Sequence, residues 1–343
     1  MKGVILVENS FVHPYMPNSV PENKKAMLDE LGINSVEDIY KSIIPDELLY
    51  KERLDIPEPI RSEYELKRHV MGILDRDITT EEYTSFLGAG CYKHQVPAIC
   101  DEVNSRGEFL TAYCGDTYSD HGKMQAIFEY TSMMGELLDT DVVSYTTYDG
   151  GQAVASSLRM AVRAVREKGM PGKVLLVPKT MNPEIYSQVV QYCRNVAEVR
   201  KIAYEPETGL MDLEELKEQL AKKNVAAVFF ENPTYLGNFE TRGEEIAKLA
   251  HDARAYCVVQ TEVAALGIME SPVNQGADIV CGDIQPLGMH IQFGGGQAGF
   301  IACNQNMDLV EQFPTYMYGI TETEKEDTYG WGRAMNYRSS HGS

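Results

Sequence analysis

The 343-residue sequence has no hydrophobic run near the roughly 20 residues that a membrane-spanning helix needs. The apolar stretch at residues 3–7 is followed by Glu8 and Asn9, so it is too short for the core of a signal peptide. We therefore expect a cytoplasmic protein that does not enter a membrane.

Basic residues are scarce, with 31 Lys and Arg against 51 Asp and Glu, which gives a formal net charge of -20. Because an acidic surface repels phosphate backbones, nucleic acid is not an expected partner. Solubility explains a charge of this size, and an acidic docking face is the alternative that charge alone does not locate.

Paired metal ligands and disulfide patterns are also missing. The seven cysteines contain no CxxC pair, and the seven histidines contain no HxxxH pair. Dispersed cysteines without a secretory signal are typical of reduced thiols in the cytosol. We therefore expect neither a metal site nor a disulfide framework.

The short motifs that identify common enzyme classes are absent as well. Gly88 and Gly90 begin like a dinucleotide-binding fingerprint, but Lys93 stands at the third glycine position. The sequence has no phosphate loop, GxSxG elbow or HExxH motif. Local motifs therefore leave the chemistry undetermined.

The pattern along the chain divides it into three parts. Residues 1–85 show helical spacing of apolar residues at 22–31, 35–42 and 63–74, interrupted by six prolines, and predict a helical arm laid over another surface. Residues 86–305 predict an α/β large domain. Residues 306–343 are irregular and polar, and we expect them to be the start of an incomplete C-terminal region.

Short β-branched runs alternate with amphipathic segments in the middle part. Strands are predicted at 142–145, 173–177, 225–230, 256–259, 278–281 and 299–302, and helices at 122–138, 151–168, 182–193, 212–223 and 243–254. Crossovers of this length favour a mostly parallel sheet covered on both faces. Asp212 followed by Glu215 predicts a capping box.

Two glycine-containing segments are candidates for ligand contact. Gly150 and Gly151 lie where a strand leads into a helix, where free backbone N–H groups bind anions such as phosphate. A tight turn that holds no ligand is the alternative, and we favour it. Residues 293–299 contain a run of three glycines before a strand, which fits either close backbone approach or a flexible turn.

Several ordered motifs resemble a known family. They are residues 86–97 (FLGAGCYKHQVP), 122–130 (GKMQAIFEY), 181–184 (MNPE), 276–288 (GADIVCGDIQPLG) and, in the arm, 31–39 (LGINSVEDI). In order and spacing they resemble the alpha subunit, or subunit 1, of the glycine cleavage system P protein, along nearly the whole chain.

The resemblance implies a fold-type-I pyridoxal-phosphate architecture with a mostly parallel sheet. It also implies a function in which glycine is decarboxylated and its aminomethyl group passes to the lipoyl arm of the H protein. In two-subunit versions, alpha pairs with a homologous beta subunit that carries the cofactor. The family has a C-terminal small domain that this sequence stops short of.

A lysine amine is required to hold pyridoxal phosphate as a Schiff base. In this fold the lysine would follow the strand at 278–281 and precede the glycines at 294–296, but residues 281–293 contain no lysine. Lys248, the one lysine between Lys223 and Lys325, is predicted on a helix facing away from the site. We therefore expect no covalent cofactor and no catalytic residue on this chain.

A strand-end aspartate of the family fold is also replaced. The strand at 256–259 leads to Glu262, where fold-type-I enzymes use an aspartate against the pyridine nitrogen, and a capping or surface carboxylate is the favoured interpretation. By analogy with shared active sites in such dimers, Tyr92, Tyr113, Phe293, Gly294 and Gly295 are candidates to line the partner's cofactor pocket. For the tyrosines, ordinary packing is the alternative.

Departures from the family pattern leave alternatives open. Lys93 and Gln95, residues 114–118, Asn182 and residues 231–234 differ from the usual alpha-subunit residues in loops expected to face the partner. One alternative is a divergent paralogue that is an orphan scaffold or regulator, or acts on another amine. Another is a stand-alone decarboxylase or aminotransferase relative that uses Lys179 or Lys123, although neither follows the correct strand.

Overall fold

The computed structural model describes residues 12–334 apart from 51, 53, 87–91, 108, 110–120 and 296. The chain divides into two compact units, Met1–Ile78 and Thr79–Ser343. The predicted domain limits after residues 85 and 305 stay predictions. None of the described helices has the length and apolar content needed to cross a membrane.

The first unit is a set of short helices: η1 (Pro17–Ser19), α1 (Pro21–Leu31), α2 (Val36–Ile43), η2 (Asp46–Leu48) and α3 (Glu63–Leu74). The helices form where the spacing of apolar residues predicts them. Gly32 ends α1 in the left-handed region, at φ +67°, where glycine carries no steric penalty. Among the residues described in this unit, none is buried.

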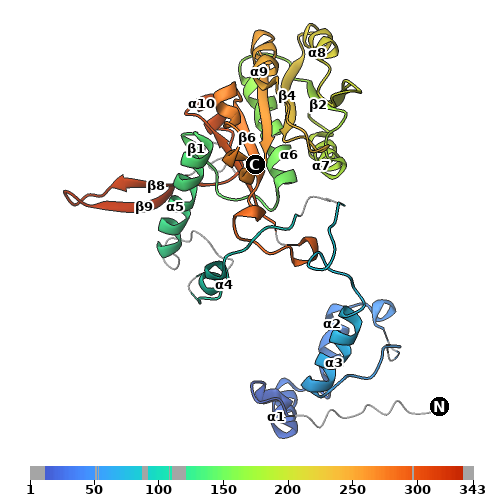
Figure 1. The fold of residues 1–343 in the computed structure, drawn as a ribbon. Helices are drawn as coiled ribbons and strands as arrows, with labels where there is room; N and C mark the ends of the chain where they lie inside the picture. The colour runs from blue at the N-terminus through green and yellow to red at the C-terminus, as the bar shows by residue number, and fades with distance from the viewer. Residues whose placement is uncertain are drawn as a thin grey trace. The chain divides into compact units, whose positions relative to one another are not determined.

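The second unit contains a seven-stranded sheet in the order β1-β7-β6-β5-β4-β2-β3 (Figure 1). Its strands are β1 (Val142–Val143), β2 (Val174–Pro178), β3 (Glu198–Ile202), β4 (Val225–Asn232), β5 (Tyr256–Thr261), β6 (Ile279–Asp283) and β7 (Gly299–Cys303). Strands β3, β2, β4, β5 and β6 pair in parallel, whereas β7 is antiparallel to both β6 and β1. The predicted α/β class with a mostly parallel sheet is confirmed.

Helices cover both faces of this sheet. They are α5 (His121–Leu138), α6 (Gly150–Glu167), α7 (Pro183–Cys193), α8 (Leu213–Leu220), α9 (Gly243–Asp252) and α10 (Met307–Val310), whereas the short helix α4 (Ala98–Asn104) has no residue in the sheet's buried clusters. Side chains alternate across β4, so Phe229 packs in the cluster under α6 and Phe230 in the cluster under α9. Every residue of β4 is buried, as expected for a central strand covered on both faces.

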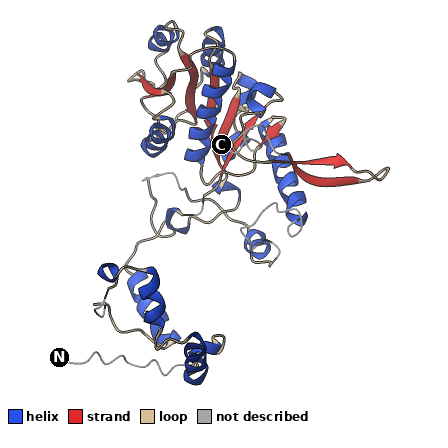
Figure 2. Cartoon of the chain, turned by 180° about the vertical axis from the view of Figure 1, so that it is seen from behind, coloured by secondary structure: helices blue, strands red, loops and turns tan. Residues whose placement is uncertain are grey.

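Two strands of a separate hairpin, β8 (Met317–Glu322) and β9 (Tyr329–Ala334), form an antiparallel pair that extends from the sheet (Figure 2). The expectation of irregular structure after residue 306 was therefore wrong for this segment. The hairpin packs on α5, where the rings of Phe128 and Trp331 lie 5.0 Å apart. The remaining short turns are η3 (Val263–Gly267), η4 (Pro272–Gln275), η5 (Gln285–Leu287) and η6 (Gln292–Gly294).

The six predicted strands and the predicted helices of the second unit are all present, and two local predictions need correction. Strand β3 was missed. The predicted capping box at α8 is confirmed for Asp212, which caps the helix. It is wrong for Glu215, whose carboxylate accepts a hydrogen bond from the Ala203 amide instead. Its carboxylate thereby ties α8 to the chain that follows β3.

Candidate functional site

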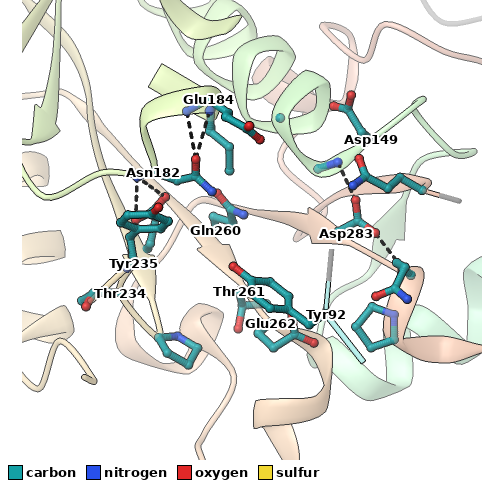
Figure 3. A pocket seen from close by; sticks show the side chains of 18 of the residues that line it. Tyr92, Asp149, Asn182, Glu184, Thr234, Tyr235, Gln260, Thr261, Glu262 and Asp283 are labelled. Carbon is teal, nitrogen blue, oxygen red and sulfur yellow. Dashed lines mark hydrogen bonds between the residues drawn. The ribbon is translucent and has the colours of Figure 1, made fainter. Parts of the chain in front are cut away.

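A pocket of about 370 Å³ opens at the carboxyl ends of β4, β5 and β6 and beside the first turns of α6 and α7 (Figure 3). Parallel strands end at one edge of the sheet, and open α/β sheets bind ligands at this edge. The topology therefore makes this pocket the candidate functional site of the chain. The site is assembled from segments between Tyr92 and Gln297.

The first turn of α6 forms one wall. Asp149 precedes the helix, and its carboxylate accepts a hydrogen bond from the Gln152 amide at 2.6 Å. The Gly150 amide donates to Asp283 Oδ2 at 3.0 Å. A Cβ on Gly150 would lie 3.1 Å from Asp283, so glycine permits this close approach. Carboxylates of the chain itself thus accept hydrogen bonds from two backbone amides of this glycine-containing turn.

Asp283 ends β6 and is held on both carboxylate oxygens. Oδ1 accepts a hydrogen bond from the Gln285 amide at 2.7 Å, and Oδ2 accepts from Gly150. Burial raises the pKa of Asp283, the backbone hydrogen bonds oppose this rise, and the negative charge of Asp149 adds to it. Asp283 therefore joins the end of β6 to the start of α6, across 133 residues of sequence.

Glu231 near the end of β4 forms the opposite wall and is only 5% exposed. Its carboxylate accepts hydrogen bonds from the Asn182 amide at 3.1 Å and the Tyr235 amide at 3.3 Å. Burial raises the pKa of Glu231 to about 7, although both amides favour the charged form. Asn182 also caps α7, where its side chain accepts from the Glu184 amide at 2.9 Å.

The floor between these walls comes from the end of β5. Glu262 caps η3 by accepting a hydrogen bond from the Ala264 amide at 3.3 Å, so the predicted capping role is confirmed. Burial raises the pKa of Glu262, and the nearby His94 opposes the rise. Gln260 Oε1 and His94 Nε2 are buried with no hydrogen-bond partner in the described part of the chain.

The charge of the lining is strongly one-sided. Five carboxylates reach the pocket, and His94 is the one basic side chain among the described residues that line it; the acids are Asp149, Glu184, Glu231, Glu262 and Asp283. No described lysine or arginine lines it. Residues 87–91, 108 and 110–120 contain no lysine or arginine in the sequence either.

The lysines considered from the sequence lie elsewhere. Lys248 lies on the exposed face of α9 and does not line the pocket, as predicted, and its ammonium group pairs with Asp252 at 2.6 Å. Neither Lys123 nor Lys179 lines the pocket. A pyridoxal-phosphate site needs a lysine amine for the Schiff base and must accommodate a phosphate dianion. The described lining has no lysine and has five carboxylates, so it does not fit this cofactor.

The predicted contact residues have different locations. Tyr92 lines the pocket of this chain and is 42% exposed. Phe293 is 98% exposed, and neither it nor Gly294 nor Gly295 lines the pocket. Tyr113 lies outside the described residues. Their role toward a partner stays a prediction.

Sequence reasoning did not identify Asp149, Asp283 and Glu231 as residues of one site. The sequence feature that came nearest to identifying this site was the departure from the family pattern at Asn182 and at residues 231–234. Asn182, Glu231, Pro233 and Thr234 all line this pocket. Among the described residues, no three His, Cys, Asp or Glu side chains are grouped as metal ligands.

The comparisons of this chain with known proteins all indicate the same family. The family model for the glycine cleavage system P-protein matches residues 13–341. Proteins named probable glycine dehydrogenase (decarboxylating) subunit 1 are similar to the chain, with 35% identity in Staphylothermus marinus and 37% in Pyrococcus horikoshii. These matches cover 91% and 95% of this chain and 66% and 71% of the relatives, so the chain spans about two thirds of their length.

Solved structures agree with this result. A crystal structure of glycine decarboxylase (P-protein) in inhibitor-bound form matches with a TM-score of 0.77 and 30% identity, covering 95% of this chain and 69% of that one. A Burkholderia pseudomallei sphingosine-1-phosphate lyase, at 13% identity and a TM-score of 0.55, shares the fold. The chain has a fold-type-I architecture and belongs to the glycine cleavage system P-protein family.

Proposed function

We propose that this chain is the noncatalytic alpha subunit of a heteromeric glycine decarboxylase in the cytoplasm. A homologous beta subunit holds pyridoxal phosphate on its own lysine, and the complex passes the aminomethyl group of glycine to the lipoyl arm of the H protein. The observation that carries the proposal is a strand-end pocket whose described lining has five carboxylates and no lysine.

Two physical requirements of the cofactor support its assignment to the partner. The aldehyde of pyridoxal phosphate forms its resting linkage with a lysine amine, which the described lining does not supply. The phosphate is an anion, and nearby carboxylates repel it in a pocket of low dielectric. When bound to the beta subunit, pyridoxal phosphate supplies the electron sink for decarboxylation.

The contribution of this chain is then structural support of the partner's site. Phe293 is exposed, and the adjacent Gly294 has φ +88°, a backbone conformation that glycine adopts readily. We propose that Phe293, Gly294 and Gly295, together with Tyr92 and Tyr113, line the beta subunit's cofactor pocket. An exposed aromatic side chain beside glycines suits close contact with another chain.

Reconstitution tests the proposal. The full chain is mixed with its lysine-bearing homologue and with lipoylated H protein, and CO2 release from glycine is measured. We expect activity from the mixture and none from this chain alone. Equal activity from the homologue alone would contradict the proposed role, and the orphan-scaffold alternative would then be favoured.

A matched pair of variants tests the contact residues. Phe293→Ala removes an aromatic side chain that is 98% exposed, whereas Ile268→Ala removes an apolar side chain that is 82% exposed elsewhere. We expect Phe293→Ala to lower the activity of the complex by roughly tenfold and leave the Tm of this chain unchanged. Ile268→Ala should leave both unchanged, and equal losses in the two variants would contradict a specific role for Phe293.

A further inference from the structure

We propose that Asp283 is a built-in anion that occupies the first turn of α6 and excludes phosphate groups, so this chain rejects even noncovalent pyridoxal phosphate. The inference deepens the proposed function and rests on it. It adds a cause to the missing lysine: two amides of this turn, those of Gly150 and Gln152, already donate to carboxylates of the same chain.

Two amides at the start of α6 already donate to carboxylates of this chain. The first N–H groups of a helix have no intrahelical partner and attract anions. In this 18-residue helix, the first residue, Gly150, donates to Asp283, and the third, Gln152, donates to Asp149. A phosphate at this turn would have to displace one or both carboxylates.

Asp283 is fixed in place by hydrogen bonds to both of its carboxylate oxygens. Its Oδ1 is held by the Gln285 amide at 2.7 Å while Oδ2 is held by Gly150. The strand end behind it is tightly packed, since a Cβ on the preceding Gly282 would lie 2.3 Å from the Thr261 carbonyl oxygen. Moving the carboxylate away from α6 therefore breaks hydrogen bonds at both ends.

The acidic side chains around Asp283 also oppose the entry of a phosphate group. Asp149, Glu184, Glu231 and Glu262 line the same pocket as Asp283, and no described lysine or arginine there offsets them. A phosphate dianion entering the pocket meets the ionised carboxylates of this set at short range, where solvent screens like charges weakly. Glu231, with its pKa raised to about 7, adds only part of a charge near neutral pH. Burial and the neighbouring Asp149 also raise the pKa of Asp283, so exclusion of anions weakens as the pH falls.

Substitution of Asp283 tests the inference in the full chain. Asp283→Ala frees the Gly150 amide and removes the charge. Asp283→Asn removes the charge, keeps the shape and has one carbonyl oxygen for two amides. Glu262→Gln is the matched control, because it removes one charge from the same pocket without touching the first turn of α6.

Binding of inorganic phosphate and of pyridoxal 5′-phosphate is measured by titration calorimetry, and folding is checked from the Tm. We expect the two Asp283 variants to bind both probes at least about tenfold more tightly than the wild-type chain. Glu262→Gln should change affinity by about twofold or less, since it frees no amide. Asp283→Asn carries the test if Asp283→Ala does not fold.

Saturable phosphate binding by the wild-type chain as tight as that of the Asp283 variants would overturn the inference. An equal gain in affinity for Glu262→Gln would also overturn it, because the loss of any one negative charge from the pocket would then explain the gain. Folded Asp283 variants that show no gain in affinity would overturn it as well. Each of these results leaves the proposed function standing. The proposed function fails separately, if the cofactor is found bonded to a lysine of this chain.

Discussion

The two units of this molecule differ most in how they bury apolar side chains. The second unit has two large clusters of buried residues, one on each face of its sheet. The first unit has no buried residue among those described, although its helices have leucines, isoleucines and tyrosines at regular spacing. An apolar face at helical spacing that is exposed among the described residues indicates a segment that is stabilised by another surface.

The second unit therefore accounts for most of the stability of the chain, whereas the first unit is suited to contact with another surface. The α/β unit has the central buried strand and helix-covered sheet of a self-sufficient domain. The helical unit depends on local capping and propensity, which contribute little in short helices. Substitutions should therefore have large effects on stability in the second unit and small effects in the first.

The largest contrast is expected from truncating one apolar side chain in each unit. Phe229→Ala empties a fully buried position in β4 and should lower the free energy of unfolding by about 3–5 kcal/mol. Leu48→Ala, at a side chain 74% exposed, should change it by less than about 0.5 kcal/mol. Chemical denaturation measures both, and a large loss for Leu48→Ala would show that the first unit has a core of its own.

A pH-dependent effect of intermediate size is expected at Glu231. Because the folded pKa is raised to about 7, the folded state holds a proton that the unfolded state releases near the usual value of 4.5. Stability from this group is present below pH 4.5 and is lost as the pH rises through 7. The change corresponds to about 3 kcal/mol.

The Glu231→Gln variant isolates this term, since it cannot lose a proton. Its free energy of unfolding, followed from pH 5 to pH 8, should decline less steeply than that of the wild-type chain. Glu47→Gln, in the exposed first unit, is the control and should follow the wild-type profile. Parallel slopes for all three proteins would argue against titration of Glu231.

The smallest effects come from one substitution made in a helix of each unit. Gly72→Ala in α3 meets open space and should stabilise that helix by about 0.5–1 kcal/mol. Gly135→Ala in α5 places a Cβ 2.9 Å from the Thr140 carbonyl oxygen and should destabilise by roughly 1–3 kcal/mol. Helix content by circular dichroism and the Tm measure whether each substitution stabilises or destabilises the chain. A change in the same direction for both variants would contradict this distinction between the units.

The sequence predicted the sheet well because its strands are continuous apolar runs between amphipathic helices. Strand β3 was missed because it lies at the sheet edge, where Glu198, Arg200 and Lys201 break the apolar pattern. The β8–β9 hairpin was missed because glycine and polar residues separate its aromatic side chains, so no continuous run marks it.

The site was predictable in part. The missing lysine and the capping role of Glu262 follow from local sequence and strand order. The bond between Gly150 and Asp283 does not, since the residues are 133 positions apart and meet only when β6 lies next to α6. Burial that raises the pKa of Glu231 is likewise a property of the assembled pocket.

Covalent trapping of the cofactor shows which of the two chains holds pyridoxal phosphate. The full chain is incubated with pyridoxal 5′-phosphate, reduced with borohydride, digested and examined by mass spectrometry. We expect no stoichiometric adduct on this chain and a stoichiometric adduct on the lysine of its homologue in the same mixture. A stoichiometric adduct on any lysine of this chain would contradict this expectation.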